Sequence, residues 1–142
     1  MVYLRGHHLI CLRFFQGQGY DAAFLAGVEE VRQRLAAGEQ IVVMAGPDAV
    51  CRVCPWLQGD ECTHPETTDA GIRKMDQAAL EILHLTPDSR WYWPQFTPRE
   101  LESGFAEWFR GFCRECSWRP ACQAHPDFQA LLKKIGEEAL KS

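Results

Sequence analysis

The chain has 142 residues, of which 46% are hydrophobic and 24% are charged, and its net charge at pH 7 is −4. A chain of this length can bury about two-thirds of its unfolded surface, so we expect a single domain over residues 1–142. These values exclude a disordered protein and argue against a polyanionic partner, so we expect no nucleic acid to bind.

The sequence lacks the apolar stretches that membrane spans and signal peptides require. Charged residues interrupt the segment MVYLRGHHLICLRFF, and no stretch reaches about 20 apolar residues. We therefore expect a cytoplasmic protein with no membrane partner. In a reducing compartment the seven cysteines favour metal ligation over a disulfide framework, and their odd number would leave one thiol unpaired in any case.

The first half of the chain predicts helices and one strand. Residues 4–15 could be helical, which would bring three residues with reactive side chains to one side of that helix: His7, His8 and Cys11. A second helix is expected between Asp21, its N-cap, and Gly38, because apolar residues recur there every three or four positions. The β-branched run Ile41–Met44 predicts a short strand that leads into the first group of cysteines.

The second half repeats this arrangement of helices and cysteines. A helix is expected after Thr68, and the aromatic segment 90–96, which contains Pro94, should be extended or irregular. Thr97 then caps a helix that leads to the second group of cysteines, and a last helix starts at Pro126 and buries residues as far as Ala139. We expect a mainly α, single small domain of about five helices with a short strand and two Cys-rich metal-binding loops.

Six of the seven cysteines form two triads with similar spacing. The first, with the spacing Cys-x2-Cys-x7-Cys, is Cys51, Cys54 and Cys62. The second, with the spacing Cys-x2-Cys-x5-Cys, is Cys113, Cys116 and Cys122. A Cys-x-x-Cys pair can turn both sulfurs toward one ion, and a third cysteine supplies another corner of a tetrahedron, so both triads predict metal binding.

Each triad needs a fourth ligand, and the sequence leaves three arrangements open. In the first, His64 and His125 complete two separate zinc sites of three cysteines and one histidine. In the second, one triad and Cys11 hold a single [4Fe-4S] cluster. In the third, the Cys-x-x-Cys pairs of both triads form one four-cysteine site, which would join the two halves of the chain.

The adjacent residues His7 and His8 are candidates for catalysis. Imidazole titrates near neutral pH, so both could act as general acid and base on a small substrate, or as metal ligands. The sequence contains no phosphate-binding glycine loop, no Gly-x-Ser-x-Gly elbow and no His-Glu-x-x-His helix. The remaining hypotheses are a metal-binding protein, a small enzyme built around the two histidines, and a redox sensor that uses its thiols.

Three segments of the chain form a recognisable set: residues 4–11 (LRGHHLIC), followed by Gly19-Tyr20, residues 46–55 (GPDAVCRVCP) and residues 113–122 (CRECSWRPAC). Together they resemble a family of short bacterial and archaeal proteins of unknown function that is suspected of binding an iron-sulfur cluster. The resemblance implies cluster ligation by the six triad cysteines, with Cys11 as a further candidate. It does not include His64 or His125, so it favours an iron-sulfur cluster of the [4Fe-4S] type over zinc. We expect a structural or electron-transfer role with an unidentified redox or protein partner.

Overall fold

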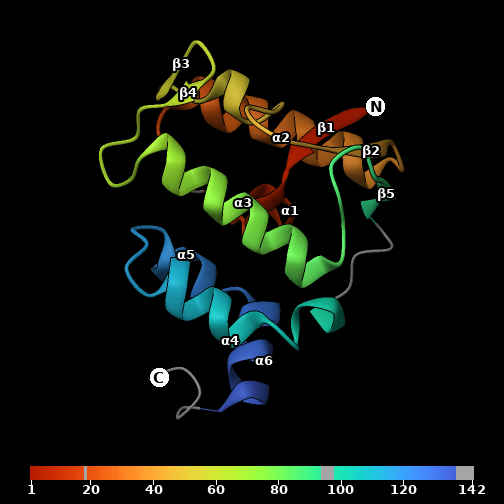
Figure 1. The fold of residues 1–142 in the computed structure, drawn as a ribbon, viewed down its shortest axis with the longest axis vertical. Coiled ribbons are helices and arrows are strands. Elements are labelled where there is room, and N and C mark those ends of the chain that lie inside the picture. The colour runs from red at the N-terminus through yellow and green to blue at the C-terminus, as the bar shows by residue number, and fades with distance from the viewer. Residues whose placement is uncertain (18, 94–97, 137–142) are drawn as a thin grey trace.

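The computed structural model describes residues 1–17, 19–93 and 98–136 (Figure 1). Those residues form six α-helices: α1 (Gly6–Cys11), α2 (Ala22–Ala36), α3 (Asp69–Leu83), α4 (Phe105–Trp108), α5 (Arg119–Gln123) and α6 (Pro126–Ile135). They also form five short strands: β1 (Val2–Arg5), β2 (Gln40–Met44), β3 (Leu57–Gln58), β4 (Glu61–Cys62) and β5 (Arg90–Tyr92). The expected small, mainly α domain is confirmed. No helix in the described part of the chain has the length and apolarity needed to cross a membrane.

A three-stranded sheet in the order β1-β2-β5 supports the N-terminal segment. Strand β2 is the strand expected at 41–44, and β1 pairs with it in parallel, from Val2 opposite Ile41 to Arg5 opposite Met44. Residues 4 and 5 were expected to be helical, and that prediction is wrong: they belong to β1, and the helix begins at Gly6. Buried Val2 and Leu4 alternate with exposed Tyr3, as expected for a strand. The alternation covers too few residues to be recognised from the sequence.

The two long helices form where the sequence predicts them. The Asp21 side chain accepts the N–H of Phe24 at 2.7 Å, and the Thr68 hydroxyl accepts the N–H of Gly71 at 3.0 Å, so both helices have side-chain caps. Figure 1 shows α3 running between α2, with the sheet, and the C-terminal group α4, α5 and α6. Helix α3 contacts α1, which carries His7, His8 and Cys11, and β4, which carries Cys62.

Helix α1 crosses α3 at unusually close range because Gly6 has no side chain. A Cβ at Gly6 would lie 2.2 Å from the backbone oxygen of Asp76, which is far inside van der Waals contact. This approach brings the residues that follow Gly6 directly onto the middle of α3. The position of His7 and His8 therefore depends on this glycine.

The segment before the second triad is less regular than the expected single helix. Thr97, its expected cap, lies outside the described residues; residues 98–101 form a 3₁₀ turn, and α4 continues as a π-helix over Phe109–Cys113. Gly104 interrupts the helix because glycine has a low helix propensity, and a Cβ there would lie 2.7 Å from Ile82 on α3. The last helix starts at Pro126 as expected; Ala139 lies outside the described residues.

Candidate functional site

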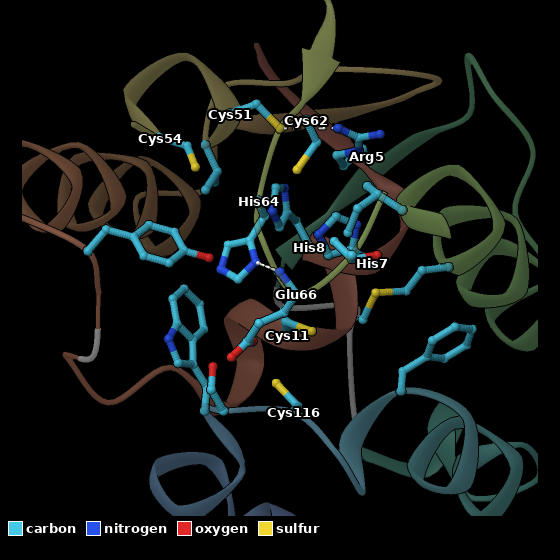
Figure 2. Close-up of a pocket in the computed structure, with 18 of the residues that line it drawn as sticks. Arg5, His7, His8, Cys11, Cys51, Cys54, Cys62, His64, Glu66 and Cys116 are labelled. Carbon is cyan, nitrogen blue, oxygen red and sulfur yellow. Dashed lines mark hydrogen bonds between the residues drawn. The ribbon is translucent and has the colours of Figure 1, made fainter. Parts of the chain in front are cut away.

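A pocket of about 350 Å³ opens between the two groups of cysteines (Figure 2). Five cysteines and three histidines contribute to its wall: Cys11, Cys51, Cys54, Cys62, Cys116, His7, His8 and His64. In Figure 2 the first triad lies on one side of the pocket, and Cys116 lies across from it. The fold thus gathers most of the predicted site residues, from four separate stretches of the chain, around one space.

The first triad is held by a tight turn and a hairpin. Residues Cys51–Val53 form a 3₁₀ turn, and the N–H of Cys54 donates to the carbonyl of Cys51 at 3.0 Å. Strands β3 and β4 then return the chain so that Cys62 faces the same pocket. The Asp48 carboxylate caps the turn through Oδ1, which accepts the N–H groups of Val50 and Cys51, each at 3.0 Å.

Arg5 is buried, and its guanidinium reaches both halves of the site. Its Nε donates to Asp76 Oδ2 at 2.8 Å, and its Nη1 donates to Cys51 Sγ at 3.3 Å. Burial raises the pKa of the Cys51 thiol to about 12, and the hydrogen bond from Arg5 opposes that rise. Arg5 is therefore a positive charge fixed beside a candidate thiolate.

The second triad meets Cys11, the last residue of α1. Burial raises the pKa of the Cys11 thiol well above its usual value, and neighbouring charges at Cys113, Cys122 and Cys116 would raise it further. Burial and the other two thiols of the triad likewise raise the pKa of Cys113. Cys11 and Cys113 are therefore buried thiols with other cysteines of this set nearby, and a bound cation would stabilise their thiolates.

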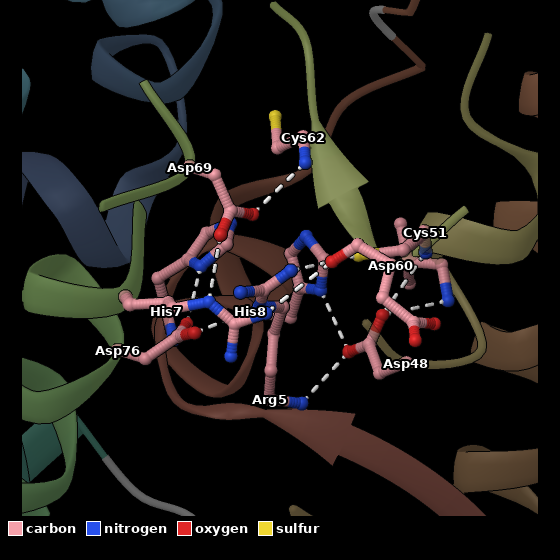
Figure 3. A network of polar contacts seen from close by, with 11 residues as sticks. Arg5, His7, His8, Asp48, Cys51, Asp60, Cys62, Asp69 and Asp76 are labelled. Atoms are coloured by element: carbon pink, nitrogen blue, oxygen red, sulfur yellow. Dashed lines mark hydrogen bonds and ion pairs between the residues drawn. The ribbon is translucent and has the colours of Figure 1, made fainter. Parts of the chain in front are cut away.

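Each histidine of the adjacent pair binds its own carboxylate (Figure 3). His7 Nδ1 lies 2.6 Å from Asp76 Oδ1, and His8 Nδ1 lies 2.7 Å from Asp48 Oδ2. Both carboxylates are buried and also accept backbone N–H groups, from His7 for Asp76 and from Arg5 for Asp48. An ionised carboxylate at Nδ1 places the proton on that nitrogen, so each neutral ring carries its lone pair on Nε2, and both rings line the pocket.

His64 and His125 have the opposite tautomer. His64 Nδ1 accepts the N–H of Glu66, and His125 Nδ1 accepts the N–H of Asp127, each at 3.1 Å. A backbone N–H can only donate, so the neutral ring of each residue carries its proton on Nε2, where a metal would need a lone pair. His125 caps α6 and is not among the residues that line the pocket. This geometry gives no support to the arrangement with two local histidine ligands.

One compact group of ligand atoms occurs in the described part of the chain. A ring nitrogen of His8, a carboxylate oxygen of Asp48 and the sulfur of Cys51 lie within 4.8 Å of one another. The Asp48 oxygens already accept four donors, from His8 Nδ1 and from the N–H groups of Arg5, Val50 and Cys51. Asp48 therefore acts by holding His8 beside Cys51.

The state of His7 predicts how stability depends on pH. Burial, His8 and Arg5 lower its pKa to about 4, although the hydrogen bond to Asp76 opposes them. Between pH 6.5 and 4 the unfolded chain binds a proton that the folded chain does not, so this contribution is complete above pH 6.5 and is lost as the pH falls. We expect the free energy of unfolding to drop by up to about 1.4 kcal/mol per pH unit in this window.

Urea unfolding of protein in one defined metal state, at several values between pH 6.5 and 5, would measure the slope. His7→Gln should reduce the slope, whereas the change at an exposed histidine, His84→Gln, should leave it as in the wild type. Equal slopes for His7→Gln and the wild type would contradict the assignment of this pH dependence to His7.

The sequence analysis did not identify the buried charged residues Arg5, Asp48 and Asp76 as members of the site. For Asp48 and Asp76 the sequence does contain a feature that could have indicated a role. Asp48 stands three residues before Cys51, where an aspartate can cap a turn, and Asp76 falls next to Met75 on the apolar side of its helix. Both carboxylates could have been proposed as partners for nearby cations.

A known protein family matches most of the chain, but its description names no activity. No curated protein and no solved structure matches it. A family described as a protein of unknown function (DUF1284) matches residues 19–122, which include both cysteine triads and Asp48. The resemblance to a family of unknown function is thereby confirmed at that level, whereas an iron-sulfur cofactor and a bacterial or archaeal origin are not. The match extends over more than half of the sequence, and the chain therefore belongs to the DUF1284 family.

Proposed function

We propose that the protein binds a [4Fe-4S] cluster through the thiolates of Cys11, Cys113, Cys116 and Cys122. The observation that carries the proposal is the position of Cys11 at the end of α1, because Cys11 lines the same pocket as Cys116 and the turn after it contacts α5, which carries Cys122. A set of four thiolates is the usual donor set for this cluster. The fourth ligand that the second triad lacks in the sequence is thus supplied from the N-terminal segment.

The chemistry of the ligands supports a cluster over a zinc ion at this position. Four cysteines and no histidine are the usual donor set of a [4Fe-4S] cluster. Zinc sites completed by His64 and His125 are the alternative that the sequence offers. The hydrogen bonds that Nδ1 of each of these histidines accepts do not favour it.

We propose a structural or electron-transfer role in the cytoplasm, with an unidentified redox or protein partner. Cys116 is exposed, and it is the thiol of the set that a partner could approach most closely. The sulfur of an exposed ligand offers a short route for an electron. A partner that docks beside Cys116 would then exchange electrons with the cluster.

Replacement of Cys11 tests the cluster. Cys11→Ser should remove iron, sulfide and broad visible absorption from protein purified without oxygen, because one of four thiolates is lost. The matched control is Cys54→Ser, which changes a half-buried cysteine of the other triad and should retain the iron. Full iron content and an unchanged spectrum in Cys11→Ser would contradict the proposal.

A small enzyme that uses His7 and His8 beside the metal is the second candidate. It is favoured by the two histidine–carboxylate pairs, which orient both rings and leave both Nε2 lone pairs on the pocket side. In this case the neutral His7 ring would accept a proton from a small substrate. Loss of a cellular phenotype in a His7→Gln, His8→Gln double variant that keeps its fold and iron would support it.

A further inference from the structure

The proposed cluster leaves the first triad without an assigned ligand. We propose that Cys51, Cys54, Cys62 and His8 Nε2 hold one zinc ion, as a second metal centre across the pocket from the cluster. This inference goes beyond the proposed function and does not depend on it. It rests on the thiols, on the orientation of His8 and on the position of Arg5.

The three thiols come from one local stretch of the chain and line the same pocket. Cys51 and Cys54 stand at either end of the same tight turn, and the β3–β4 hairpin brings Cys62 to the same pocket wall. A hydrogen bond of 2.9 Å from the Cys62 N–H to Asp69 Oδ1 fixes the end of that hairpin. Three cysteines on a turn and a hairpin are a frequent partial ligand set for zinc.

His8 is the histidine that is prepared to complete this set. Asp48 binds both His8 Nδ1 and the turn that carries Cys51, and His8 and Cys51 line the same pocket. Zinc-binding histidines usually donate their other ring N–H to a carboxylate in this manner, which fixes the tautomer and the orientation of the ring. His64 lines the same pocket but has its lone pair at Nδ1, where it is already occupied.

Arg5 compensates the charge that such a site would carry. Three thiolates around a divalent ion leave one net negative charge, and the Arg5 guanidinium donates directly to Cys51 Sγ. Nη2 of the buried Arg5 guanidinium has no hydrogen-bond partner among the described residues. Burial of such a positively charged group lowers the stability of the fold unless negative charge lies nearby. A zinc–thiolate centre supplies those negative surroundings. Zinc rather than iron follows from the mixed set of three sulfurs and one imidazole.

Metal content tests the second centre in protein purified without oxygen. We expect one zinc per chain in addition to iron. His8→Gln and Cys54→Ser should weaken zinc binding at least tenfold in competition with a chelator and leave the iron, whereas Cys11→Ser should remove the iron and leave the zinc. Asp48→Asn should weaken zinc binding by about 10–100-fold, because Asp48 positions a ligand.

His64→Gln is the matched control, since it changes another histidine of the pocket wall, two residues after Cys62, and it should bind zinc as the wild type does. Unchanged zinc affinity in His8→Gln, or loss of zinc in His64→Gln instead, would overturn the assignment of His8. If every variant of the first triad loses iron but keeps its zinc, the first triad does not hold zinc, and the second centre is overturned. If no sample contains iron, the result contradicts the proposed cluster and leaves the zinc centre unaffected.

X-ray absorption at the zinc edge of the wild-type protein needs no variant and so remains informative if a variant fails to fold. We expect three sulfurs at about 2.3 Å and one nitrogen at about 2.0–2.1 Å. Four sulfurs, or fewer than three, would overturn the proposed ligand set.

Discussion

Asp76→Asn is expected to lower the free energy of unfolding by about 3–5 kcal/mol, because it removes the counter-ion of a buried arginine. Arg5 is 1% exposed and Asp76 is 6% exposed, and the two are joined by a bond of 2.8 Å. The asparagine amide also cannot accept from both Arg5 Nε and His7 without turning an N–H group toward a donor. This loss is a large part of the roughly 5–15 kcal/mol that holds a typical domain together.

Urea unfolding of the wild type and the variant, in the same metal state, would measure the effect as a lower midpoint at an unchanged slope. The control is Glu29→Gln, which removes an exposed ion pair with Arg32, 3.2 Å apart, and should change stability by less than about 0.5 kcal/mol. If Asp76→Asn lowers the free energy of unfolding no more than Glu29→Gln does, the buried pair of Arg5 and Asp76 does not stabilise the fold.

Gly6→Ala should have the second large effect, about 2–4 kcal/mol, because the added methyl group meets backbone instead of a movable side chain. The new Cβ would lie 2.2 Å from the oxygen and 2.8 Å from the carbonyl carbon of Asp76, so α1 and α3 must separate. The separation would lengthen the hydrogen bonds from Arg5 and His7 to Asp76. The variant should therefore lose stability together with metal affinity at His8.

Thermal unfolding and zinc content of Gly6→Ala would be compared with those of Gly111→Ala. A Cβ at Gly111 would meet no atom within 4 Å, although that residue also lines the pocket, so the control should differ little from the wild type. Similar melting temperatures for the two variants would show that α1 can move away from α3 at little cost.

The sequence predicted the helices and strands that are marked by residues within or next to the element itself. Asp21 and Thr68 cap helices that begin one residue later, and the β-branched run at 41–44 forms a strand. Strand β1 was not predicted because its four residues need β2, nearly forty positions away, as a pairing partner. The π-helix that ends at Cys113 was not predicted either, because no residue pattern distinguishes it from an α-helix; such turns often occur at functional sites.

The sequence predicted which residue types form the candidate site better than it predicted how they are arranged in space. The cysteine spacing indicated metal binding, and the sequence also singled out the pair His7 and His8. Which histidine can offer a lone pair to a metal depends on the partner of each Nδ1, and those partners are buried aspartates on other elements. No local pattern contains that information, so His64 and His125 were as plausible as His8 in the sequence.

The four proposed cluster ligands lie far apart in the sequence, so they are synthesised at different times. Cys11 is made early, but its partners follow at positions 113 to 122, so more than a hundred residues must be added before the set is complete. At about 5–20 residues per second this delay is on the order of ten seconds. Ligands of the first triad emerge well before then, with His8 already made. The proposed zinc ligands are thus complete once Cys62 has been made, whereas the proposed cluster ligands are complete only after Cys122.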